Sequence, residues 1–208
     1  MAYDLEEQEQ LDEFKAWWKK NGKIATNLVL AALVAYAAWQ AYGYFQNKKA
    51  VEASELYQAL LVTDLTKTAE IKAQSAKLMD SYSGTPYAGR AAMFAAKANF
   101  SANDDKSAKA QLEWAIKNAK EAAVKAMAGL QLANVLFEQK DYDGAQKVLA
   151  AINDKGYEGL KSSLQGDVYL AQGKNLEAKK AFENALNNLD VQGKLYQYTQ
   201  QKIESLGA

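Results

Sequence analysis

Residues 164–186 read LQGDVYLAQGKNLEAKKAFENAL, and small and aromatic residues alternate along this stretch at fixed offsets. The five positions that carry the alternation are Gly166, Tyr169, Ala178, Phe182 and Ala185. Small residues let two helix backbones approach closely, and the aromatic side chains fill the space between one helix pair and the next. The stretch therefore predicts a pair of short helices, and such a pair needs a neighbouring pair to cover its apolar face.

Two earlier segments repeat this spacing. The positions 33 residues upstream are Ala133, Leu136, Ala145, Leu149 and Ile152. The positions a further 37 residues upstream are Ala96, Asn99, Ala108, Leu112 and Ala115. The second set keeps the small and apolar residues of the second helix, but it lacks the aromatic residue of the first. The chain therefore carries three copies of one unit, of which the earliest is degenerate.

The repeated pattern resembles the tetratricopeptide repeat and predicts an all-α protein, in which one N-terminal transmembrane helix precedes a tetratricopeptide-like helical repeat domain, an α-solenoid. One proline and abundant Ala, Leu, Lys, Gln and Glu agree with helix almost throughout. Thr85 before Pro86 predicts a helix start. Residues 50–82 predict two further helices without the signature, and residues 191–206 predict a capping helix. The alternative is that alanine-rich amphipathic helices produce such spacings by chance.

Stacked helix pairs leave a concave surface that is lined mainly by the first helix of each pair and is suited to binding a peptide or a partner helix. By register, the groove candidates for protein binding are Met93, Lys97, Phe100, Leu130, Asn134, Phe137, Ser163, Asp167 and Leu170. The alternative for the apolar members of this set is packing in the core. Phe137→Asp tests the interpretation, because it weakens binding without unfolding only if Phe137 faces the groove.

The membrane anchor is predicted from residues 24–47, IATNLVLAALVAYAAWQAYGYFQN, which contain no charged residue. At about 1.5 Å per residue this helix exceeds the ~30 Å hydrocarbon layer of a bilayer. Trp17 and Trp18 before it and Trp39, Tyr42 and Phe45 near its end are typical of headgroup-level aromatic belts. We predict three parts: a segment 1–23, a transmembrane helix 24–45 and a repeat domain 46–208. A buried helix of a soluble protein and a signal peptide cleaved near residues 35–37 are the alternatives.

Orientation follows from the lysines on either side of the span. Four lysines precede it (Lys15, Lys19, Lys20 and Lys23) and two follow it closely (Lys48 and Lys49). The positive-inside rule then places segment 1–23 in the cytoplasm and the repeat domain on the far side, the periplasm of a bacterium. Residues 5–18 predict a short amphipathic helix that either lies against the headgroups or docks a cytoplasmic partner.

Composition excludes several functional classes. The chain has no cysteine and no histidine, which removes thiolate chemistry, imidazole bases and most transition-metal sites, so we expect no cofactor and no metal. Acidic and basic residues balance at 25 each, so a nucleic-acid partner is not expected. An enzyme that uses carboxylates alone would depend on pairs such as Asp104 and Asp105, or Asp141 and Asp143, which turn and cap roles explain better.

The order of an acidic start, LDEFKAWWKKNGK (residues 11–23) entering one span, and a degenerate repeat domain ending in GDVYLAQGKNLEAKKAFENAL (residues 166–186) resembles the YfgM family of ancillary SecYEG translocon subunits. The resemblance implies a single-pass type II protein of the bacterial inner membrane that binds SecYEG and a PpiD-like periplasmic chaperone. It also implies a link to stress signalling through a cytoplasmic response regulator, and it supplies no catalytic residue.

Three functions stay open at this point. The first is an ancillary translocon subunit that binds proteins at the periplasmic exit and mediates chaperone contact for newly translocated polypeptides. The second is a membrane-anchored repeat scaffold for envelope assembly or stress signalling. The third, a carboxylate enzyme, would need carboxylates that converge in a deep pocket with raised pKa values.

Overall fold

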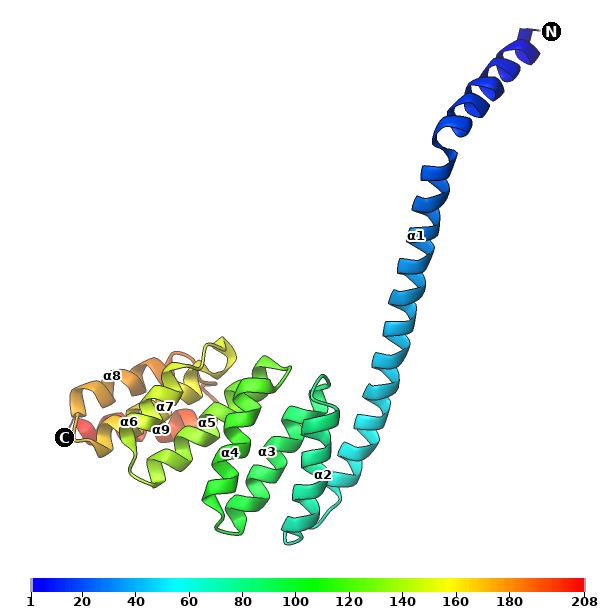
Figure 1. Cartoon of the computed structure of the whole chain (residues 1–208). Helices are drawn as coiled ribbons and strands as arrows, with labels where there is room; N and C mark the ends of the chain where they lie inside the picture. The colour runs from blue at the N-terminus through cyan, green and yellow to red at the C-terminus, as the bar shows by residue number, and fades with distance from the viewer. Residues whose placement is uncertain (1, 208) are drawn as a thin grey trace. The chain divides into compact units, whose positions relative to one another are not determined.

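The computed structural model describes residues 2–207, with side chains from residue 6 onward, and it is helical in nearly all of that range (Figure 1). Met1 and Ala208, which begin and end the predicted segments, and the Leu5 side chain of the predicted amphipathic helix lie outside the described part. The helices are α1 (Ala2–Leu61), α2 (Thr68–Ser81), α3 (Pro86–Ser101), α4 (Asp105–Asn118), α5 (Ala122–Glu138), α6 (Tyr142–Ala150), α7 (Glu158–Ala171), α8 (Asn175–Leu186) and α9 (Lys194–Leu206), with a 3-10 turn η1 (Lys155–Tyr157). The all-α prediction is confirmed.

The chain divides into two units, residues 1–48 and 49–208, and each is described by itself. The first unit contains the part of α1 up to residue 48. Helix α1 is long and apolar enough to cross a membrane, and none of its apolar window is buried. Helix α1 continues unbroken through the predicted amphipathic helix and the span, because it contains no proline and its two glycines fit a helical backbone. Large apolar side chains such as Leu28 and Trp39 are about two-thirds exposed, which suits a lipid surrounding.

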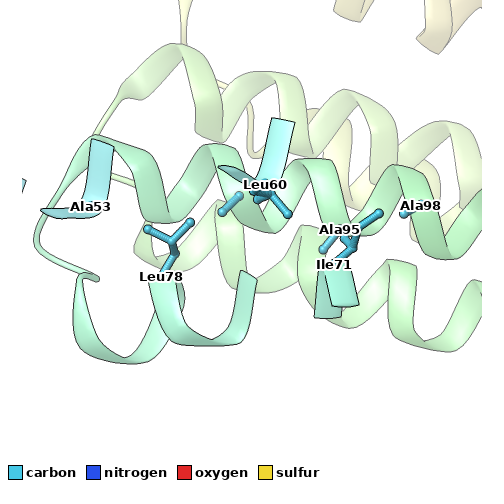
Figure 2. Packing of buried hydrophobic residues seen from close by; sticks show 7 residues of the cluster. Ala53, Leu60, Ile71, Leu78, Ala95 and Ala98 are labelled. Carbon is cyan, nitrogen blue, oxygen red and sulfur yellow. The ribbon is translucent and has the colours of Figure 1, made fainter. Parts of the chain in front are cut away.

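The second unit begins with a core to which α1, α2 and α3 all contribute (Figure 2). Leu60 of α1 and Leu78 of α2 are fully buried there. Facing them, α3 presents alanines such as Ala95 and Ala98, whose small side chains allow the helices to pack closely. The last three turns of α1 are therefore part of the folded repeat unit.

Three turns of the same geometry separate the first and second helices of successive pairs. Asn103, Lys140 and Gly173 each have positive φ, of 59°, 61° and 73°. At each turn the next residue's N–H donates to a carbonyl five residues back, as Asp104 does to Asn99 over 2.9 Å. The turns lie 37 and 33 residues apart, so the backbone repeats with the same period as the sequence pattern.

The small residues of the sequence pattern lie where one helix packs closely against another. Ala133, Ala145 and Ala178 are fully buried. Gly166 of α7 faces the ring of Phe182, which is itself fully buried in α8, and the two helices meet closely there. Close approach of the backbones is the role that such residues play in stacked helix pairs.

Helix α3 begins at Pro86, as the sequence predicts, with Thr85 at the N-cap position. The Thr85 side chain makes no capping bond, because its hydroxyl donates to the carbonyl of Tyr82 over 2.8 Å. Asp104 and Asp141 do cap their helices, accepting from the backbone N–H groups of Ser107 and Gly144.

The last helix, α9, starts at Lys194, three residues later than expected, because Asp190 and Gly193 form a turn ahead of it. Its outer face carries exposed polar residues, as expected of a cap. Two contacts tie it to α7: the hydroxyls of Ser163 and Thr199 lie 3.4 Å apart, and Lys202 forms an ion pair with Asp167 at 2.5 Å.

Candidate functional site

A groove of about 590 Å³ runs across the inner helices α3, α5 and α7 and reaches α9. A volume of this size is within the range of ordinary ligand sites. The groove is lined by Ala96, Lys97, Phe100, Ala108, Leu112, Met127, Leu130, Gln131, Asn134, Val135, Leu160, Ser163, Leu164, Asp167 and Leu195.

The groove brings together six of the nine residues that the sequence nominates. They form one pair on each inner helix: Lys97 and Phe100, then Leu130 and Asn134, then Ser163 and Asp167. Lys97, Asn134 and Asp167 occupy equivalent positions in the three repeats, and all three line the groove, as the repeat register predicts.

The remaining three nominated residues do not line this groove. Met93 packs at the edge of a core shared by α3, α4 and α5. Phe137 lies against Tyr142, with ring centroids 5.9 Å apart, and joins the core of α5, α6 and α7. Leu170 is partly exposed near the end of α7. Phe137→Asp would therefore introduce a charge into a packed cluster, and it does not test groove binding.

Sequence reasoning missed groove residues one helical turn away from those it nominated. Met127 lies one turn before Leu130, and Leu160 lies one turn before Ser163. The groove thus crosses α3 near its C-terminal end, α5 near its middle and α7 nearer its N-terminal end. Leu195 of α9 was also missed, because the sequence pattern predicts only a capping role for the final helix.

The groove surface is largely apolar, and two of its five polar side chains are engaged by α9. Asp167 is paired with Lys202, and Ser163 faces Thr199. Asn134 makes a long 3.4 Å bond to Glu138 within its own helix. Lys97 is exposed and forms no ion pair with any described residue. The groove therefore offers an apolar surface with a single unneutralised charge, which is positive.

A second cavity, of about 580 Å³, lies between α4, α5 and α6. It lies beside the end of α6, which has only nine residues, and next to the small residues Ala126 and Gly129 of α5. Lys125 and Lys147 line it as well. Nothing in the sequence pattern predicts this cavity.

Two carboxylates of the described chain have clear structural roles. Two bonds from Ser107 lower the pKa of Asp104, which is the expected consequence of capping α4. The hydrogen bond from Lys161 lowers the pKa of Glu158. Residues 2–207 contain no cluster of metal-ligating side chains.

Comparison with known proteins extends over nearly the whole chain. Residues 15–208 match a family model described as "Tetratricopeptide repeat-like domain". A protein of Neisseria gonorrhoeae named "Ancillary SecYEG translocon subunit" is 34% identical, over 99% of this chain and 100% of the relative. Proteins with the same name from Haemophilus influenzae and Escherichia coli K12 are each 27% identical, over 89% and 96% of this chain and 91% and 96% of their own lengths.

Proposed function

The chain belongs to the family of ancillary SecYEG translocon subunits, the YfgM family, and from this premise we propose that it is an adaptor that associates with the translocon and binds polypeptides beside it. We propose further that it acts at the periplasmic exit and mediates contact between newly translocated polypeptides and a PpiD-like chaperone. A tetratricopeptide-like stack without a catalytic constellation among the described residues supports an adaptor rather than an enzyme.

The observation that carries this proposal is the groove itself. Three successive repeats contribute to one continuous apolar surface, lined by residues such as Phe100, Leu130 and Leu160. Phe100 and Leu160 are 41% and 37% exposed, so their apolar atoms stay in contact with water unless a partner covers them. Burying such atoms stabilises a complex by roughly 25 cal/mol per Å² of apolar area.

The anchor sets where this groove would work. Helix α1 fits a single-pass protein of the bacterial inner membrane, and the organisation 1–23, 24–45 and 46–208 remains our proposal for its parts. The excess of lysines before the span supports a cytoplasmic N-terminus and a periplasmic repeat domain, the type II arrangement. In that arrangement the groove lies on the side where polypeptides leave the translocon.

Affinity purification of the full-length chain from its native membranes, with mass spectrometry of the recovered proteins, tests the proposal. Recovery of SecYEG and a membrane-anchored chaperone is the expected result. Recovery of wall synthases or outer-membrane factors without the translocon would move the function to an envelope scaffold. A response regulator would be expected only with the cytoplasmic segment intact.

A matched pair of variants then tests the groove. Leu160→Glu places a charge on the groove surface, whereas Leu176→Glu places the same charge on α8 at a site that is 65% exposed and outside the groove. We expect Leu160→Glu to lower recovery of the bound polypeptide or chaperone at least fivefold, and Leu176→Glu to leave it unchanged. Equal recovery from both variants would contradict binding in the groove.

A further inference from the structure

The hydrogen-bonding capacity of the groove restricts the conformation of what binds there. An extended peptide carries one N–H and one C=O per residue, and those facing an apolar surface must find polar partners or lose free energy. Of the polar side chains that line the groove, Ser163 and Asp167 are already engaged by α9. Lys97, Gln131 and Asn134 remain for a ligand.

These three side chains cannot satisfy an extended segment that crosses the groove. Neighbouring packed helices lie about 8–10 Å apart, so the path from α3 over α5 to α7 is about 20 Å. An extended chain covers that distance in about six residues and presents about twelve backbone polar groups, which point sideways from the strand toward the walls of the groove. A helix presents none, because its backbone groups bond to one another.

On this basis, and resting on the proposed function, we propose that the groove binds an amphipathic α-helix of a partner protein, with its apolar face on the groove and a carboxylate opposite Lys97. A helix of about 13 residues spans the 20 Å path. Its contact positions recur at three- and four-residue intervals, as in other helix-in-groove complexes.

The position of the carboxylate follows from the charges on the groove. Lys97 of α3 has no ion-pair partner among the described residues, whereas the one groove carboxylate, Asp167 of α7, is neutralised by Lys202 of α9. The field along the groove is therefore positive at its α3 end and close to neutral at its α7 end. A partner helix with an acidic residue at one end matches that asymmetry and is held in one direction.

Site-specific photo-crosslinking in the full-length chain, in native membranes, separates a helix from an extended segment. The photoreactive amino acid p-benzoylphenylalanine replaces Phe100, Gln131 or Leu160 in turn, which gives one probe on each inner helix. Mass spectrometry then identifies the partner residue that each probe captures. For steps of about 10 Å, a bound helix places successive captured residues six or seven apart, and an extended segment places them about three apart.

We expect the captured residues to fall within one partner segment, with about 13 residues between those reached from Phe100 and Leu160. A separation of about six residues, or adducts scattered over unrelated segments, would overturn the proposal. The same probe at Leu176, outside the groove, should not capture that partner segment. If no groove probe forms an adduct while the translocon still copurifies, helix docking is refuted and association with the translocon stands. If copurification is also lost, the proposed function fails.

A charge exchange tests the direction of the helix. Lys97→Glu should lower the crosslink yield from Gln131 at least fivefold, whereas Lys97→Arg should keep it. Replacing the mapped partner carboxylate by lysine should restore the yield in the Lys97→Glu chain. An unchanged yield in Lys97→Glu would refute the carboxylate contact.

Discussion

Gly166→Ala tests whether the repeat signature acts through close packing of α7 on α8. A Cβ atom on Gly166 would lie closer to the ring carbons of Phe182 than real Cβ contacts allow. The ring cannot retreat easily, because Phe182 is fully buried. The two helices would have to separate, or the ring would have to leave its preferred rotamer.

The expected loss comes from two opposing effects. Overpacking a well-packed core costs about 1–3 kcal/mol. Replacing glycine by alanine within a helix returns about 0.5–1 kcal/mol. From the middle of the two ranges, we expect Gly166→Ala to lower the free energy of unfolding by about 1 kcal/mol. For a domain of this size that lowers the melting temperature by about 2–4 °C.

Thermal unfolding of the detergent-solubilised full-length chain, followed by circular dichroism at 222 nm, measures this loss. Gly84→Ala is the control, because a Cβ there meets no atom within 4 Å. That change should leave stability unchanged or raise it slightly.

Phe182→Leu in the Gly166→Ala background makes the test decisive. If the new methyl group and the ring collide, the double variant loses less stability than the sum of the two single losses. Additive losses, or a Gly166→Ala chain as stable as the wild type, would refute the packing argument.

Three further predictions concern the turns, the titrating groups and the cap. Gly173 and Lys140 both have positive φ, a conformation that strains residues other than glycine. Gly173→Ala should therefore lower the free energy of unfolding by about 1 kcal/mol, and Lys140→Gly should raise it by up to about 1 kcal/mol. Calorimetry measures both changes, and equal effects of the same sign would contradict backbone strain as their cause. The pKa of Glu158 is lowered from its ordinary value of 4.5, so its contribution to stability is present above that pH and is lost as the pH falls through the folded pKa. Between pH 6 and 3 the melting temperature should therefore fall less steeply for Glu158→Gln than for the wild type. Parallel curves would contradict a stabilising role of the Glu158 carboxylate. Lys202→Met breaks the ion pair with Asp167 and should speed amide hydrogen exchange in α9 roughly fivefold, which corresponds to about 1 kcal/mol in the free energy of local opening. Exchange in α4 should stay unchanged. Equal acceleration in both helices would mean global rather than local opening.

The repeat architecture could be predicted from the sequence because its determinants are local. Positions such as Ala133 and Ala178 recur at a fixed period and are buried in the same place of each helix pair. The span was equally readable, since helices of soluble proteins rarely stay uncharged over a stretch of this length. Both signals depend on residue type and spacing alone.

Three features depend on how helices end, and the sequence pattern says little about that. Lys140 adopts positive φ without being glycine, so the equivalence of its turn to that of Gly173 is visible only in the backbone. A cavity that no motif marks lies beside the end of α6. The continuity of α1 follows from the absence of a strong helix breaker, which is a weak signal when polar and apolar segments adjoin.

The groove was predicted in part for a geometric reason. If each inner helix presented the same level to the groove, the equivalent residues Phe100, Phe137 and Leu170 would all line it. The groove instead crosses the helices obliquely, and therefore includes Phe100 near the end of α3 and Leu160 near the start of α7. An oblique path is a property of the stack, and no single repeat contains it.

Because the turns between paired helices have the same backbone conformation, loss or gain of one whole repeat would change the length of the groove without disturbing the remaining helix pairs. Asn103 and Lys140 hold the same backbone conformation 37 residues apart, so deletion of residues 104–140 would join two equivalent points and leave each remaining helix with a neighbour of the usual kind. Duplication of the same segment would lengthen the groove by one helix pair. Unequal recombination at such turns would change the length of the groove and leave the sequences of α1 and α9 unaltered.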